Sequence, residues 1–211
     1  MKIKCIENKG CPYITVNKNY IVYAGEFTVE NGFKEYNVFK IEDDYGSVIP
    51  YESKYFSIIS NNNANYIKEE VGENKYEFNY KVIAYKEFWS MLYDEAGNSI
   101  EDFRVAKNEL YRSELNKEEI LNRLGSDNID ERNFIVNLLT EEKNEEFIEN
   151  IIKICKTQLD QWKDNYNLDI LFNYLSGFKN ETINEFFIDY LSENEKGNKK
   201  LDKIVYNYFE D

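Results

Sequence analysis

The 211-residue chain contains no histidine. Histidine is the commonest general base near neutral pH and a frequent zinc ligand. Its absence excludes Ser-His-Asp and Cys-His nucleophile arrangements and His-ligated zinc. The sequence also lacks a CxxC pair, a GxGxxG or GxxxxGK[ST] phosphate-binding loop and a DxDxDG calcium loop. We therefore expect a protein that is not an enzyme and that binds no cofactor and no metal.

Cysteines and long apolar runs are also scarce. Cys5, Cys11 and Cys155 are an odd number without regular spacing, which does not fit a secreted disulfide framework. The start, Met1-Lys-Ile-Lys, becomes charged too early for a signal peptide. No run approaches the roughly 18 apolar residues that a membrane span requires. We expect a cytoplasmic protein without a membrane partner.

The net charge is −14, and the acidic excess lies mostly beyond residue 80. Residues 1–80 hold nine Lys and twelve acids, a balance of −3, which leaves −11 for residues 81–211. Such a surface repels phosphate backbones, so we expect no nucleic-acid partner. It would attract a basic protein. The plainer interpretation is that the charge only keeps the protein in solution.

Residues 1–60 show the pattern of short β-strands. Runs rich in Ile, Val, Tyr and Phe recur about every ten residues, separated by turn signals such as Asn31-Gly32. The expected strands are Lys2–Ile6, Tyr13–Val16, Tyr20–Ala24, Tyr36–Ile41 and Val48–Ile49. This spacing is typical of a small barrel or sandwich.

Residues 61–83 are interpreted as a linker followed by a strand. Residues 61–65 are four Asn and one Ala, a polar run that cannot contribute to a core. Apolar residues then alternate with polar ones, which predicts a strand with one apolar face. The apolar positions are Tyr76, Phe78, Tyr80 and Val82. The pattern leaves open whether this strand completes a barrel or forms an edge that helices cover.

From residue 84 the apolar period changes to that of α-helices. One stretch recurs, because residues 128–139 and 180–191 share an opening Asn, a Phe and a closing Leu. The apolar positions are Phe134, Ile135, Leu138 and Leu139 in the first copy and Phe186, Phe187, Tyr190 and Leu191 in the second. The similarity extends to neighbouring segments and predicts two units of about fifty residues with three helices each.

The last helix carries a stripe of five large side chains. They are Leu201, Ile204, Val205, Tyr208 and Phe209. We expect the stripe to pack only against the helix at residues 182–191, so that part of it stays uncovered. Either the helices between residues 85 and 111 fold back over it, or it mediates a homodimer.

Two family resemblances accompany these patterns. Over about 55 residues the order of strands and turns resembles an SH3-like barrel. Residues 116–209 resemble HEAT-like or armadillo-like α-solenoids in helix length and periodicity. The implied fold class is α+β, with a small N-terminal SH3-like β-barrel followed by an all-α HEAT-like helical-repeat region. The expected divisions are a barrel at 1–60, a linker and strand at 61–83, and a helical-repeat domain at 84–211.

In size, charge and architecture the chain is similar to the immunity proteins with which bacteria neutralise their own toxins. This similarity implies a non-enzymatic protein that captures a basic protein partner. The expected contact residues are acids on and around the first repeat helix: Asp127, Asp130, Glu131, Glu141, Glu142, Glu145, Glu146 and Glu149. The alternative is a solvated helix face with acids favourably placed at helix N-termini.

Two other functions stay open. An adapter would bind an extended or proline-rich peptide through Tyr45, Tyr51 and Tyr55 of the barrel, although these rings could instead pack its core. A carboxylate-dependent or metal-dependent enzyme would use adjacent acids such as Glu141 and Glu142. Adjacent acids on a helix point about 100° apart, which argues against such use.

Overall fold

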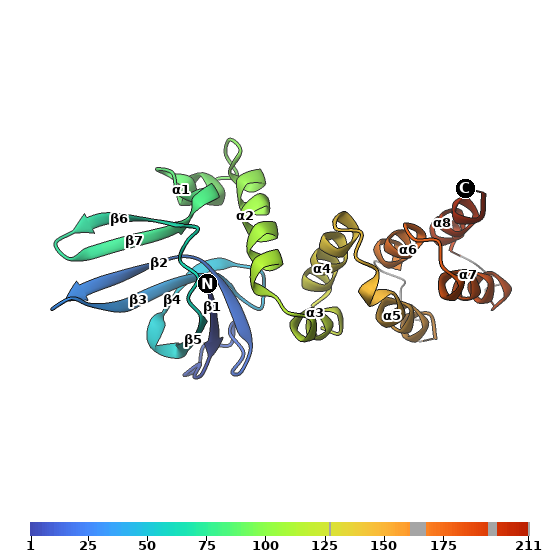
Figure 1. The fold of residues 1–211 in the computed structure, drawn as a ribbon, viewed down its shortest axis with the longest axis horizontal. Coiled ribbons are helices and arrows are strands. Elements are labelled where there is room, and N and C mark those ends of the chain that lie inside the picture. Colours follow the sequence, from blue (N-terminus) through green and yellow to red (C-terminus); the bar gives the residue numbers. More distant parts are fainter. Residues whose placement is uncertain (127, 161–167, 194–197, 211) are drawn as a thin grey trace. The chain divides into compact units, whose positions relative to one another are not determined.

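The computed structural model describes residues 1–126, 128–160, 168–193 and 198–210. The chain forms two compact units, Met1–Leu115 and Asn116–Asp211 (Figure 1). The first unit contains a seven-stranded sheet and two helices, and the described part of the second unit is helical. The chain therefore has the α+β class expected from its sequence.

An antiparallel sheet forms the base of the first unit. Its strands are β1 (Lys2–Cys5), β2 (Asn19–Glu30), β3 (Phe33–Glu42), β4 (Val48–Glu52), β5 (Phe56–Ser60), β6 (Tyr66–Gly72) and β7 (Lys75–Tyr80). At 12 residues β2 is long enough to pair with β3 on one side and, on the other, with β1 and then β7. The order is β4-β3-β2-β1-β5, with β7 and β6 extending from β2. Hydrogen bonds among the described residues do not close the sheet into the barrel that we expected.

The strand prediction needs three corrections. Residues 13–16 form turns instead of a strand, because the Thr15 amide donates to the Tyr20 hydroxyl (2.7 Å) and not to a neighbouring strand. β6 has no counterpart in the prediction, because all its residues after Tyr66 are exposed and show no apolar face. The alternating segment near residue 76 is β7, which joins the sheet through β2, but it ends at Tyr80, and Val82 lies in a 3₁₀ turn at Lys81–Ile83 instead of in the strand.

The Asn31-Gly32 turn between β2 and β3 is confirmed. The φ angles are 51° at Asn31 and 81° at Gly32. Positive φ at both positions defines the two-residue turn whose twist matches that of the flanking strands. Gly adopts this conformation freely, and Asn does so at low cost because its side chain can hydrogen-bond locally.

Two helices complete the first unit, α1 (Phe88–Tyr93) and α2 (Ser99–Glu114). α2 packs on the sheet through Phe103, whose ring centroid lies 4.8 Å from that of Tyr23. The Glu114 carboxylate accepts a 2.6 Å hydrogen bond from the Met1 amino group, and the Glu114 carbonyl accepts one from Lys2 (2.7 Å). These bonds pair the buried charges where β1 meets α2, as burial of charge requires.

The second unit is a stack of helices in two rows (Figure 1). The helices are α3 (Lys117–Leu124), α4 (Ile129–Glu141), α5 (Ile148–Asp160), α6 (Leu168–Ser176), α7 (Glu181–Glu193) and α8 (Lys199–Glu210), with a 3₁₀ turn at Glu145–Phe147. α4, α6 and α8 pack side by side in one row, α5 and α7 pack in the other, and α3 contacts α4. No helix in the described ranges is long and apolar enough to cross a bilayer.

Asparagine side chains start four of these helices. Asn116, Asn128, Asn180 and Asn198 each accept a hydrogen bond from a backbone amide in the first turn. At α3 the Glu119 side chain also accepts from the Asn116 amide (3.0 Å), which completes a capping box. The abundant Asn of this sequence therefore has a structural use, because each cap satisfies an otherwise unpaired amide.

The sequence repeat does not coincide with the packing unit. Its two copies become α4 and α7, which are three helices apart and lie in different rows. Neighbouring helices along the chain alternate between the rows, so the packing unit is a helix pair and not a group of three.

The α8 stripe is better covered than we expected. Leu201, Val205 and Tyr208 are buried, because α8 packs against α6 as well as α7. The Tyr208 ring also contacts the Phe187 ring of α7, at 5.0 Å between centroids. The expectation that one helix alone covers the stripe is therefore wrong, although Phe209 remains 46% exposed.

Candidate functional site

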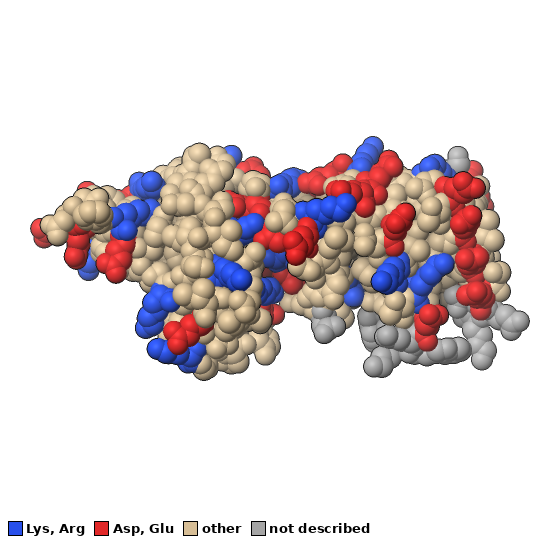
Figure 2. Space-filling model, turned by 60° about the horizontal axis from the view of Figure 1, so that its bottom comes forward, with Lys and Arg blue, Asp and Glu red and all other residues tan. Residues whose placement is uncertain are grey.

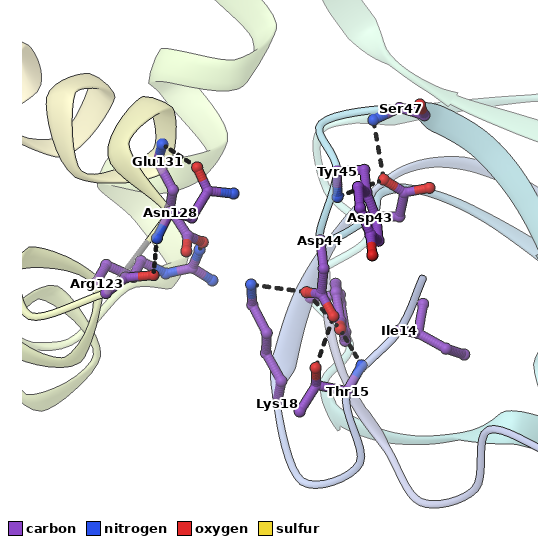
Figure 3. Close-up of polar contacts among 12 residues, drawn as sticks. Ile14, Thr15, Lys18, Asp43, Asp44, Tyr45, Ser47, Arg123, Asn128 and Glu131 are labelled. Carbon is purple, nitrogen blue, oxygen red and sulfur yellow. Dashed lines mark hydrogen bonds and ion pairs between the residues drawn. The ribbon is translucent and has the colours of Figure 1, made fainter. Parts of the chain in front are cut away.

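The turn between β3 and β4 is built on the buried carboxylate of Asp43. Its Oδ1 accepts hydrogen bonds from the Tyr45 amide (2.9 Å) and the Ser47 amide (3.0 Å) (Figure 3). Its Oδ2 accepts one from the Tyr51 hydroxyl (2.9 Å). Burial and this hydrogen bond both raise the pKa of Tyr51. These hydrogen bonds hold the turn in one conformation, so the side chains on its outer face have a fixed geometry.

Asp44 ties this turn to the loop between β1 and β2. Its carboxylate accepts hydrogen bonds from Thr15 Oγ1 (2.7 Å) and the Tyr20 hydroxyl (2.9 Å) and pairs with Lys18 Nζ at 2.8 Å (Figure 3). Burial alone would raise the pKa of Asp44, but the hydrogen bonds from Lys18 and Thr15 outweigh it and lower the pKa. Asp44 is therefore an anchored carboxylate that stays ionised at neutral pH.

The three tyrosines expected to bind a peptide have different environments. Tyr45 is 72% exposed, Tyr55 is half-buried and Tyr51 is buried beneath the turn. Tyr45 pairs edge-to-face with Tyr13, which is also exposed, at 5.4 Å between ring centroids. The sequence interpretation missed Tyr13 as a surface aromatic because it assigned residues 13–16 to a strand.

Five of the acids expected to contact a partner surround the connection between α4 and α5, and all five are exposed. They are Glu141, Glu142, Glu145, Glu146 and Glu149. Glu146 forms an ion pair with Lys117 at 2.7 Å, in which both side chains remain exposed. We refer to these five residues as the connection cluster.

The three remaining acids of the predicted set lie near the start of α4. Asp127 lies outside the described residues. Asp130 is exposed in the first turn of α4, where a negative charge favours the helix dipole. Glu131 is paired with the buried side chain of Arg123, and its amide donates to the Asn128 side chain (3.0 Å) (Figure 3). Glu131 therefore has a structural role within the helical unit.

A second acidic surface runs along α7 and has no counterpart in the sequence interpretation. Glu181, Glu185, Asp189 and Glu193 recur every four residues and are exposed. Figure 2 shows acidic side chains in a column at the right-hand edge of its view, where the helical unit ends. The opposite face of α7 is buried through Ile183, Phe186, Phe187 and Tyr190. We refer to the four acids as the α7 stripe; their spacing alone could have revealed it.

Comparison with known proteins adds no further assignment. No family model, curated protein or solved structure matches the chain. Within the residues that the structure describes, no group of three or more Cys, Asp or Glu side chains is arranged to hold a metal ion. The candidate surfaces are therefore judged by their own chemistry.

Proposed function

We propose that this chain is a non-enzymatic binding protein whose helical unit captures a basic protein partner, as an immunity-type inhibitor does. The support is the distribution of charge. The chain carries a net charge of −14, and exposed acids gather in the connection cluster and the α7 stripe. A partner with a basic surface would be attracted at long range and oriented by these two groups.

The α7 stripe is the observation that carries the proposal. Like charges four residues apart destabilise a helix by about 0.2–0.5 kcal/mol per pair. Asp189 has a cationic neighbour in Lys156, but at 3.8 Å with both side chains exposed. The stripe therefore costs helix stability. Ile188, which is 56% exposed, lies beside Glu185 and Asp189. An exposed apolar residue among charges is the composition of an interface with a polar rim.

The proposal is tested by charge neutralisation in the full chain. The chain is used to isolate a basic protein from its source cell, and the purified pair is then studied by rapid mixing at increasing salt. Glu181, Glu185 and Glu193 are changed to Gln in one variant, and Glu141, Glu145 and Glu149 in a second. A control variant carries Gln at Glu69, Glu70 and Glu73, exposed acids of the sheet unit, and changes the net charge equally.

At least one of the two variants in the helical unit should associate with the partner about tenfold more slowly than the wild type does at low salt. The control variant should slow association less. An association that salt does not weaken would contradict capture by charge. Equal slowing by all three variants would show that only net charge matters and that neither helical surface is the site.

A second candidate is an adapter that binds a peptide through the sheet unit. The β2-β3-β4 meander, followed by a 3₁₀ turn at Ser53–Tyr55 and by β5 pairing with β1, supports an SH3-like arrangement. The exposed Tyr13–Tyr45 pair offers a surface for a proline-rich segment. Chemical-shift changes induced by a proline-rich peptide should then disappear in Tyr45→Ala. Persistence of those shifts in Tyr45→Ala would remove this candidate.

A further inference from the structure

An aromatic site lies on one face of the sheet unit, away from the residues discussed above. Phe27 of β2 is the register partner of Tyr36 on β3 and of Tyr76 on β7, so these rings share a face of the sheet. Phe78 lies two residues beyond Tyr76 on the same face, with its ring 6.2 Å from that of Phe27 and 5.7 Å from that of Tyr36. Three strands thus bring the rings of Phe27, Tyr36 and Phe78 together.

The ammonium group of Lys34 occupies this site. Its Nζ lies 3.8 Å from the ring centroid of Phe27, 4.0 Å from that of Tyr36 and 5.4 Å from that of Phe78. It also donates a 2.8 Å hydrogen bond to the Tyr36 hydroxyl. All three centroids are within the range at which a cation is attracted to the ring face. No carboxylate among the described residues pairs with Lys34. Rings and one hydroxyl therefore solvate the charge.

The occupant is a flexible side chain held by ring contacts and one hydrogen bond. Lys34 is exposed and lies two residues from the β2–β3 turn, whereas Phe27 and Phe78 are almost completely buried. The receptor is therefore rigid and the occupant can leave. A site that accepts one primary ammonium by this geometry accepts another of the same size and charge. The approach of one nitrogen to three ring centroids suits a compact ammonium better than the planar guanidinium of Arg, which stacks flat on one ring face.

We propose that the rings of Phe27, Tyr36 and Phe78 are a receptor for a lysine side chain of a protein partner, and that Lys34 occupies it until the partner binds. The receptor belongs to the sheet unit and uses no acidic side chain. The inference therefore goes beyond the proposed capture by the helical unit, and either can fail without the other.

Because Lys34 occupies the receptor, it competes with any external ammonium group for the same rings. A tethered competitor acts at an effective concentration in roughly the millimolar range or above, so it reduces the apparent affinity for an external ammonium. Removing the Lys34 side chain beyond its Cβ, as in Lys34→Ala, should expose the receptor. Lys40→Ala is a matched control, because Lys40 Nζ lies over the single ring of Trp89 at 4.2 Å.

The test uses n-butylammonium, which reproduces the end of a lysine side chain, and 1-butanol as its uncharged counterpart. Aromatic carbon–proton NMR spectra of the full chain follow the Phe27 and Tyr36 rings during each titration. Lys34→Ala should bind n-butylammonium about tenfold more tightly than the wild type and Lys40→Ala do. Butanol should leave these rings unchanged, and Phe27→Leu added to Lys34→Ala should abolish the response.

Equal affinities of the wild type and Lys34→Ala for n-butylammonium would overturn the proposal. An equal response to butanol would do the same, because the site would then be merely apolar. The wild type supplies an independent measurement that needs no variant. Saturating n-butylammonium should shift the Lys34 side-chain signals toward those of a solvated lysine, and unchanged Lys34 signals would count against displacement.

Discussion

Asp44→Asn should destabilise the sheet unit by about 2–3 kcal/mol at pH 7. The wild-type carboxylate accepts from Thr15 Oγ1 at 2.7 Å and from the Tyr20 hydroxyl at 2.9 Å and pairs with Lys18 at 2.8 Å. Asparagine keeps one oxygen and places an amide NH₂ against one of these donors. A hydrogen bond to a charged group contributes about 1.5–3 kcal/mol, whereas an ion pair near the surface adds at most about 1 kcal/mol. We therefore expect the loss to come mainly from the hydrogen bonds.

The effect should depend on pH in a definite direction. The pKa of Asp44 is lowered in the folded chain, because the bonds from Lys18 and Thr15 outweigh the effect of burial. A carboxylate with a depressed folded pKa contributes stability that is present above its unfolded pKa and is lost as pH falls through the folded pKa. An unperturbed Asp has a pKa of 3.8. The difference between wild type and Asp44→Asn should stay constant from pH 7 to about 4 and shrink below that.

Urea unfolding at several pH values measures this difference. Replacing Trp162 by Phe in both proteins leaves Trp89, in the sheet unit, as the fluorescent reporter. Asp94→Asn is the matched control, because Asp94 is an exposed acid of the same unit and its removal should change stability by less than about 0.5 kcal/mol. A difference between wild type and Asp44→Asn that persists undiminished to pH 2, or that is absent at pH 7, would refute the reasoning.

Three further predictions concern packing, thiol reactivity and helix capping. Gly25→Ala should destabilise the sheet unit by about 1–3 kcal/mol in urea unfolding, because the new Cβ would overlap the Val38 carbonyl; an unchanged midpoint would contradict this. In the folded chain a thiol reagent such as Ellman's reagent should modify Cys11 quickly and Cys155 very slowly, because Cys155 is fully buried and burial raises the pKa of its thiol. Rapid reaction of both thiols before unfolding would show that the helical unit opens readily. Asn116→Ala should lower the stability of the helical unit by about 1 kcal/mol, measured as a loss of helical circular dichroism at a lower urea concentration. Asn116→Ser should keep most of the wild-type stability, because Ser also caps helices.

Much of the sheet could be predicted because its signals are local. The Asn31-Gly32 turn fixes the β2–β3 hairpin, and the alternation at residues 75–80 reflects one buried face. β6 could not be predicted, because an edge strand is held by hydrogen bonds to β7 and needs no apolar pattern of its own. Residues 13–16 have the composition of a strand, but the Tyr20 hydroxyl takes the Thr15 amide that a neighbouring strand would otherwise bind.

The candidate surfaces were less accessible to sequence reasoning than the fold. A run of acids such as Glu141 to Glu149 is visible in the sequence, and the structure places it around one exposed connection. The roles of Glu131 and Tyr51 depend on Arg123 and Asp43, each eight residues away in the sequence and brought close only when the chain turns between two elements. The site around Lys34 depends on strand register, which brings Phe27 and Phe78 together from segments about fifty residues apart.

The helical repeat shows why a periodic pattern can identify buried residues and still give the wrong packing unit. α4 and α7 share an apolar pattern because each buries one stripe against neighbours, and this requirement is the same in both rows of the stack. The match therefore says which residues face the core and does not say in which row a helix lies. Because successive helices alternate between two rows, two helices that are three positions apart along the chain lie in opposite rows. If α7 is treated as a copy of α4, the acids expected to contact a partner are those at the start and end of α4. The exposed acids of α7 instead run along its whole length. Only the packing of the helices shows in which row α7 lies, and its position in that row leaves the α7 stripe exposed where a partner could bind.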